Sequence, residues 1–134
     1  MSSKVVIGAN YGDEGKGLIT DYLVRKYGLS YAARFNGGAQ AGHTVVDENR
    51  RHVFSHIASG TFAGAGTILT RDFIVSPILF RREYAKFTHA SVWVDYRAEM
   101  STPYDMFLNQ FSAAKQGHNS CGLGINETVK RGVS

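Results

Sequence analysis

The chain has 134 residues, 15 lysines and arginines against 11 aspartates and glutamates, and 43% hydrophobic residues. That length corresponds to about one small domain, with enough apolar residues for a core and too little net charge for intrinsic disorder. No run of about 18 apolar residues is present and the first residues lack a signal-peptide pattern, so we expect neither a membrane span nor secretion. The single cysteine, Cys121, cannot form an intrachain disulfide, and a reduced, cytoplasmic setting is expected.

Short apolar segments typical of strands alternate with segments of helical spacing along the chain. Strands are expected at residues 4–8, 31–35, 43–46, 51–57, 67–69, 73–75 and 91–95, and helices at residues 15–27, 77–87, 103–115 and 126–131. Gly28 stands where a helix C-cap is expected, and Ser76 and Thr102, each followed by proline, are typical of helix N-caps. The alternation predicts an α/β fold, with a mainly parallel sheet and flanking helices in a P-loop-NTPase-like arrangement.

Glycine is the informative residue type in this sequence. Thirteen of the 15 glycines fall in four clusters, within residues 8–17, 37–42, 60–66 and 117–124. Such clusters at the ends of apolar segments indicate loops in which the backbone turns tightly or approaches a ligand closely. Because the basic residues are spread evenly along the chain, a nucleotide is favoured over a nucleic acid as the partner.

The strongest local signal lies between the first expected strand and the first expected helix, in the stretch G-A-N-Y-G-D-E-G-K-G at residues 8–17. A glycine-rich turn that enters a helix directs backbone N–H groups at an anion, and Lys16 adds a charge for a β- or γ-phosphate. The stretch is neither a Walker A loop nor a G-x-G-x-x-G fingerprint. A carboxylate beside phosphate would repel it unless it holds Mg²⁺ or takes a proton, so either Asp13 or Glu14 is expected to face the chemistry.

Two further loops carry groups suited to an anion. The stretch G-G-A-Q-A-G-H-T at residues 37–44 follows an expected strand, and ligands of parallel sheets bind at the carboxyl ends of strands, so the first two loops are expected to meet over one crevice. His43 could there donate to a transferring phosphoryl group, whereas the other four histidines are interpreted as structural. The stretch N-S-C-G-L-G at residues 119–124 offers hydroxyl, amide and N–H donors, and Cys121 fits packing better than nucleophilic attack.

Residues 11–17 and 37–44 together resemble the motifs W-G-D-E-G-K-G and G-G-x-N-A-G-H-T of the adenylosuccinate synthetase family, and residues 74–77 resemble its V-x-S-P helix start. The resemblance is firm over residues 4–80 and looser up to Arg131. Tyr11 replaces Trp, Gln40 replaces Asn, and S-C-G-L-G at residues 120–124 replaces T-T-G-R-G, which suggests a divergent branch of phage or archaeal type. Family members are well over twice as long, so the chain is expected to be the N-terminal portion of a larger catalytic domain.

The resemblance implies a ligase of purine nucleotide biosynthesis. The acid matching Asp13 would remove the N1 proton of IMP while GTP, or ATP, phosphorylates O6, and the histidine matching His43 would stabilise the moving phosphoryl group. L-Aspartate would then displace the phosphate to give adenylosuccinate. Mg²⁺ would be held by the Asp13 carboxylate and the Gly42 carbonyl.

The resemblance also implies two sets of binding residues. Nucleotide phosphate is expected at Gly12, Glu14, Gly15, Lys16, Gly17, Gly42 and Thr44. The purine monophosphate is expected at Asp13, Lys16, Gln40, Ala41, His43, Ser120, Cys121 and Arg131. Lys130 or Arg131 falls near a family arginine that reaches into the neighbouring subunit of a homodimer.

Two alternatives stay open at this point. A phage-type 2-aminoadenylosuccinate synthase acts on dGMP, but its members replace the proton-abstracting Asp with Ser, so Asp13 favours IMP. The chain could instead be a truncated nucleotide-binding module without full activity. In each case we expect a cytoplasmic protein (host cytoplasm if viral) with no membrane or nucleic-acid partner.

Overall fold

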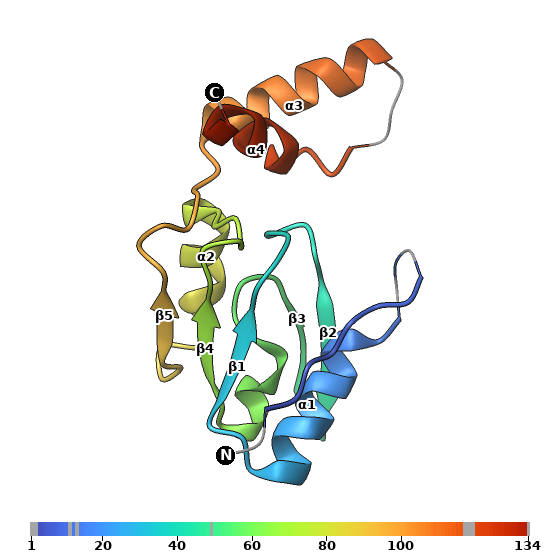
Figure 1. Ribbon diagram of the computed structural model, residues 1–134, viewed down its shortest axis with the longest axis vertical. Coiled ribbons are helices and arrows are strands. Elements are labelled where there is room, and N and C mark those ends of the chain that lie inside the picture. The colour runs from blue at the N-terminus through green and yellow to red at the C-terminus, as the bar shows by residue number, and fades with distance from the viewer. Residues whose placement is uncertain (1–2, 11, 13, 49, 117–119, 134) are drawn as a thin grey trace.

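A parallel three-stranded sheet forms the centre of the computed structural model, which describes residues 3–10, 12, 14–48, 50–116 and 120–133. The strands β1 (Tyr31–Arg34), β4 (Gly66–Leu69) and β5 (Val92–Val94) lie in the order β1-β4-β5, with Tyr31 paired to Gly66 and Thr67 to Val92 (Figure 1). Helices flank this sheet, so the expected α/β class with a parallel sheet is confirmed.

The helices begin close to the expected residues. They are α1 (Lys16–Tyr27), α2 (Pro77–Tyr84), α3 (Pro103–Gln116) and α4 (Ile125–Val133), with a 3-10 turn η1 (Ser59–Ala63) that the sequence did not predict. Gly28 ends α1 as expected, because its φ of 58° lets its N–H reach the Val24 carbonyl. The expectation that the second helix runs to residue 87 is wrong, since after Tyr84 tight turns carry the buried Phe87 into the core.

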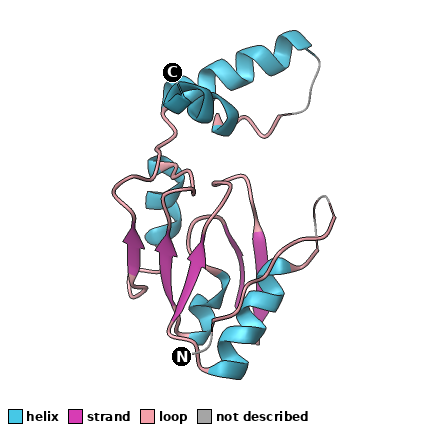
Figure 2. Cartoon of the chain, in the orientation of Figure 1, coloured by secondary structure: helices cyan, strands magenta, loops and turns pink. Residues whose placement is uncertain are grey.

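An antiparallel hairpin, β2 (His43–Asp47) and β3 (Arg50–Phe54), stands beside the parallel sheet and shares no ladder with it among the described residues (Figure 2). The expected strand at residues 51–57 is therefore too long. It ends at Phe54 because the next three backbone N–H groups, at residues 55–57, donate to the carboxylate of Glu83 instead of to a neighbouring strand.

Two other segments expected to be strands are not strands in the structure. The strand at residues 4–8 is wrong: this segment forms no ladder, Val5 and Ile7 are 73% and 76% exposed, and it borders a cavity of about 230 Å³ against α1 and β1. Residues 73–75 are not a strand either, although Ile74 and Val75 make single parallel bridges to Gly38 and Met100. A short apolar run marks burial or interaction, but it does not supply the neighbouring strand that a ladder needs.

The core consists of three apolar clusters. One joins the hairpin to the segment after α2, and the other two pack around α1 and around β4; they comprise Val45, Phe54, Ile57, Phe87 and Ala90, then Val24, Ala32, Ala58 and Ala65, then Leu69, Phe73, Val75 and Ala98. Burial of a side chain such as Phe54 contributes about 1.5–3 kcal/mol, so the first cluster anchors β2 and β3 firmly. Within the described ranges, no helix is long and apolar enough to cross a bilayer.

Candidate functional site

The first glycine-rich loop leads directly into α1. Gly15 adopts a left-handed φ of 70° at the N-cap, and its carbonyl accepts the Ile19 N–H at 3.0 Å, which starts the helix at Lys16. The Lys16 ammonium contacts the Glu14 carboxylate at 2.8 Å, and the other Glu14 oxygen accepts the Asn10 N–H at 2.6 Å. The hydrogen bonds from Lys16 and then Asn10 hold the pKa of Glu14 below its usual value. Glu14 is therefore an anion that balances the charge of Lys16.

The second glycine-rich loop leads from β1 to the hairpin. Gly37 has a left-handed φ of 71°, its carbonyl accepts the Ile74 N–H at 2.8 Å, and the Ala41 N–H closes a turn on the Gly38 carbonyl. A Cβ on Gly38 would lie 2.9 Å from the Ile74 carbonyl oxygen, so a side chain there would break this approach. The turn places residues 40–44 beside the N-terminus of α1.

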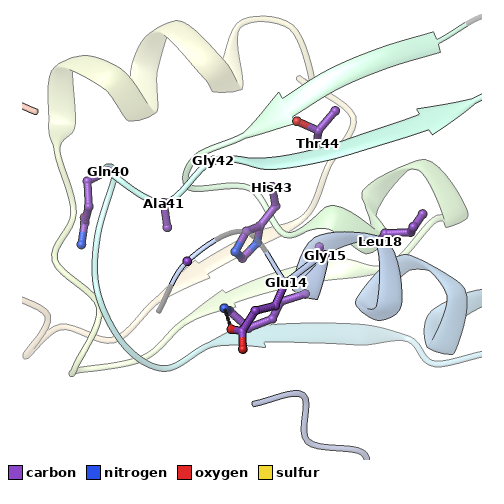
Figure 3. A pocket seen from close by; sticks show the side chains of 11 residues that line it. Glu14, Gly15, Leu18, Gln40, Ala41, Gly42, His43 and Thr44 are labelled. Atoms are coloured by element: carbon purple, nitrogen blue, oxygen red, sulfur yellow. Dashed lines mark hydrogen bonds and ion pairs between the residues drawn. The ribbon is translucent and has the colours of Figure 1, made fainter. Parts of the chain in front are cut away.

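Both loops line one pocket of about 580 Å³ (Figure 3). Its walls include all the described residues expected to bind phosphate or magnesium, together with the expected purine contacts of the second loop: Gly12, Glu14, Gly15, Lys16, Gly17, Gln40, Ala41, Gly42, His43 and Thr44. Leu18, which the sequence did not single out, completes the lining. In Figure 3 the ring of His43 points toward Glu14, whereas the side chain of Thr44 points away from both. The expected meeting of the two loops over one crevice is what the structure has.

His43 is a neutral imidazole at neutral pH. Burial, together with the charges of Arg34 and Lys16, lowers its pKa to about 4. Its position depends on Gly17, since a Cβ on Gly17 would lie 2.5 Å from the His43 Cβ. A neutral imidazole carries one N–H and one unprotonated nitrogen, so it can donate to an oxyanion without bringing a permanent charge.

The remaining expected site residues lie elsewhere. Asp13, expected as proton acceptor and metal ligand, lies outside the described residues. The Ser120 hydroxyl donates to the side-chain amide oxygen (Oδ1) of Asn109 at 2.6 Å, and Cys121 is an exposed free thiol. Arg131 holds the carboxylate of Asp105 at 3.0 and 3.1 Å. None of these three residues lines the pocket, so the structure assembles the first two loops and leaves the third with α3 and α4.

The histidines interpreted as structural have structural partners where they are described. His56 is fully buried, and its Nε2 accepts the Ser76 N–H at 2.9 Å, which places the proton on Nδ1, 3.7 Å from Glu83. His52 contacts the same carboxylate at 3.1 Å, and His89 lies beside the ring of Phe87. His118 lies outside the described residues.

Sequence reasoning missed two buried charges next to the site, Arg34 and Glu83, each 7% exposed. Burial lowers the pKa of Arg34 to about 10. Burial alone would raise the pKa of Glu83, but hydrogen bonds from His56, Ser55 and His52 lower it to about 2. For Arg34, the sequence offered one signal of a buried charge, namely a charged residue at the end of the apolar strand at residues 31–34.

Comparison with known proteins identifies a family whose model covers both glycine-rich loops. The family model for adenylosuccinate synthetase matches residues 5–134, almost the whole chain. The chain belongs to the adenylosuccinate synthetase family. The adenylosuccinate synthetase of Borrelia turicatae is 35% identical over 137 residues, and that of Heliobacterium modesticaldum 35% over 139 residues; each alignment covers 99% of this chain. The chain spans 30% and 31% of those two relatives.

A solved structure agrees with this membership at the level of the fold. The chain resembles a fully ligated adenylosuccinate synthetase from Plasmodium falciparum with a TM-score of 0.77, over 93% of this chain and 32% of that one. The sequence identity is 23%, so this likeness bears on the P-loop-like fold alone. The two loops that meet at the pocket carry the family motifs on that fold.

Proposed function

We propose that this chain supplies the phosphoryl-transfer half of an adenylosuccinate synthetase site. Asp13 takes the N1 proton of IMP, O6 attacks the γ-phosphorus of GTP, and GDP leaves. The amine of L-aspartate then attacks C6 and expels the phosphate, giving adenylosuccinate. The observation that carries this proposal is a pocket lined by Lys16, the backbone of residues 15–17 and a neutral His43, all of which belong to the family's two motifs.

The residues of this chain act by position and charge, which is what phosphoryl transfer requires. Lys16 and the backbone N–H groups at the start of α1 neutralise phosphate oxygens. In the absence of ligand the Lys16 charge is balanced by Glu14 at 2.8 Å, so an incoming phosphate competes with that carboxylate. The N–H of His43 donates to the phosphoryl oxygens as charge develops on them.

We infer that Mg²⁺ would be held here in the way nucleotide enzymes bind it. The described residues contain no cluster of three metal-binding side chains. Mg²⁺ is usually held by one or two carboxylates and substrate phosphates, with waters completing its shell. We assign the Asp13 carboxylate and the Gly42 carbonyl as its protein ligands. The ion would neutralise charge on the transferring phosphate.

The finer assignments belong to the same proposal. We assign IMP as the acceptor, since Asp13 stands where the dGMP-using branch has Ser. We assign GTP as the phosphoryl donor because the family resemblance implies it. ATP and dGMP are the competing ligands. A homodimer and a cytoplasmic setting follow from the same family. The second candidate is a nucleotide-binding module without turnover, which the same phosphate-binding pocket would also support.

Replacement of Lys16 by alanine tests the proposal. We expect Lys16→Ala to weaken binding of GTP or IMP about 10- to 100-fold, because a charge-assisted contact contributes about 1.5–3 kcal/mol. Lys26→Ala, on the last turn of the same helix, is the matched control and should bind as the unaltered chain does. Isothermal titration supplies the affinities, and an assay of succinylated purine with Mg²⁺ and L-aspartate separates enzyme from binding module.

Equal affinity of Lys16→Ala and the unaltered chain would show that Lys16 does not bind phosphate in this pocket, and would contradict the proposal. Binding without product would leave the second candidate. Product that is lost in both Asp13→Ala and His43→Ala would support the synthetase reaction.

A further inference from the structure

The backbone of Ser55 is held between two buried charges that the proposed reaction does not use. The Ser55 N–H donates to Glu83 at 2.9 Å, and the Ser55 carbonyl accepts a hydrogen bond from the Arg34 guanidinium. Arg34 is the last residue of β1, whereas Glu83 lies on α2. These contacts therefore connect the parallel sheet and a helix at one residue, directly after the hairpin.

Glu83 binds more than this single N–H. Its other oxygen accepts the His56 N–H at 2.6 Å and the Ile57 N–H at 3.3 Å, and His52 lies 3.1 Å from the first oxygen. These backbone groups form a small anion nest that orders residues 55–57 directly after β3. The hydrogen bonds hold the pKa of Glu83 at about 2, so it is a carboxylate under all ordinary conditions.

Arg34 is fixed as firmly on the opposite side. Its guanidinium lies over the ring of Phe73, 4.7 Å from the ring centroid, and its side chain is 7% exposed. It borders a cavity of about 250 Å³ together with Lys16, Gln40 and His43, but it does not line the larger phosphate pocket. Arg34 is thus adjacent to the reacting groups without reaching the place assigned to phosphate.

The hairpin connects His43 to this arrangement. His43 pairs with Phe54 across the hairpin, and Ser55 follows Phe54 directly. Since the hairpin shares no ladder with the parallel sheet among the described residues, side-chain contacts must set its position. The fit of His43 against Gly17 leaves no room for displacement, because even a Cβ on Gly17 would be 2.5 Å away.

We propose that Arg34 and Glu83 are positioning residues that hold the backbone N–H and carbonyl of Ser55 from two sides and thereby fix the imidazole of His43 over Gly17. The role of His43 itself rests on the proposed function; the positioning does not. A displacement of about 1 Å at a reacting group can lower turnover about 100-fold. Loss of either side chain's hydrogen bond to Ser55 should therefore lower kcat far more than it changes KM.

Glu83→Gln and Arg34→Lys test the proposal in the full chain, because they keep the shape or the charge of each residue. Asp95→Asn and Arg97→Lys alter an exposed ion pair in the same chemical ways and serve as matched controls. Nuclear Overhauser contacts between His43 and the Gly17 α-protons report the position of the ring. Synthesis of adenylosuccinate reports kcat and KM separately.

We expect the His43–Gly17 contact to weaken in both variants and to persist in both controls. Where the unaltered chain turns over, kcat should fall about 100-fold in Glu83→Gln with KM changed less than about 3-fold. A folded Glu83→Gln that keeps the contact at full strength overturns the proposal. If the unaltered chain makes no product, the proposed function fails, and the contact alone decides the positioning role.

Hydrogen exchange in the unaltered chain decides the matter even if both variants fail to fold. The amide protons of residues 55–57 should exchange as slowly as those of β4, since all three donate to a buried carboxylate. Exchange at the rate of an open loop would show that Glu83 does not hold this segment, and would overturn the proposal.

Discussion

At the scale of single residues, the tightest approach in the site is that of His43 to Gly17. Alanine at position 17 would place a methyl group 2.5 Å from the His43 Cβ. Overpacking costs about 1–3 kcal/mol, and the higher helix propensity of alanine returns about 1 kcal/mol. We therefore expect Gly17→Ala to lower the free energy of unfolding by at most about 2 kcal/mol while displacing His43 and weakening nucleotide binding. Ile19→Ala, a half-exposed position on the same helix, should change binding little; a Gly17→Ala chain with full affinity would contradict the role of this approach.

Glu83 gives the stability of the chain a defined pH dependence. Its pKa falls from 4.5 in the unfolded chain to about 2 in the folded protein, so the unfolded state binds the proton first as the pH falls. The contribution of Glu83 is complete above pH 4.5 and is lost between pH 4.5 and about 2, by about 3 kcal/mol in total. Urea midpoints measured across this range should therefore fall less steeply for Glu83→Gln than for the unaltered chain. Parallel curves for the two proteins would contradict it.

The residues that sequence reasoning found and those it missed differ in a physical respect. Lys16, Gln40 and His43 stand within contiguous stretches whose glycines already indicate a ligand loop. Arg34 and Glu83 act through partners 21 to 31 positions away in the chain, on elements whose packing no local pattern contains. A buried charge is stable only with such partners, so its role becomes visible only in the folded chain.

At the scale of the elements, two helix starts with the same sequence signal turn out to be different. Thr102 caps α3: its hydroxyl accepts the Asp105 N–H at 3.2 Å, and the Asp105 carboxylate accepts the Thr102 N–H at 2.8 Å. The Ser76 hydroxyl, at the start of α2, is buried and has no hydrogen-bond partner among the residues that the structure describes. We expect Thr102→Ala to lower the free energy of unfolding by about 1 kcal/mol, and Ser76→Ala to leave it unchanged or raise it slightly. Equal losses in urea titrations of the two variants would show that Ser76 is a cap after all.

The elements also show where sequence patterns succeed. Sequence patterns predicted the four α-helices within the described residues, because helix spacing and capping are local properties. Strands depend on a partner: residues 66–69 find β1 and β5 on either side, whereas residues 4–8 find none and stay exposed at Val5 and Ile7. The apolar run was the same kind of signal in both segments, and pairing decided between them.

At the scale of the whole molecule, the chain divides between a dense region and an open one. The dense region comprises the hairpin, α1 and β4, which contribute residues to the three core clusters. The open region comprises α3 and α4, which extend away from the sheet as a pair (Figure 1). Asp105 and Arg131 join that pair, and Ile125 reaches back toward Gly38 in the second loop. The described part of the fourth glycine cluster, residues 120–124, is thus connected to the site through α4 and does not line it.

The open region should make the isolated chain associate. Tyr104 and Phe107 on α3 are 66% and 61% exposed, and Trp93 on the edge strand β5 is 48% exposed. Apolar patches of this kind and an unprotected sheet edge both favour contact with other chains. We expect sedimentation velocity to show association that grows with concentration, and the double variant Tyr104→Lys, Phe107→Lys to reduce it. Tyr96→Lys removes a single exposed ring outside α3 and should reduce association less. An unaltered chain that stays monomeric up to its solubility limit would show that these surfaces do not mediate association.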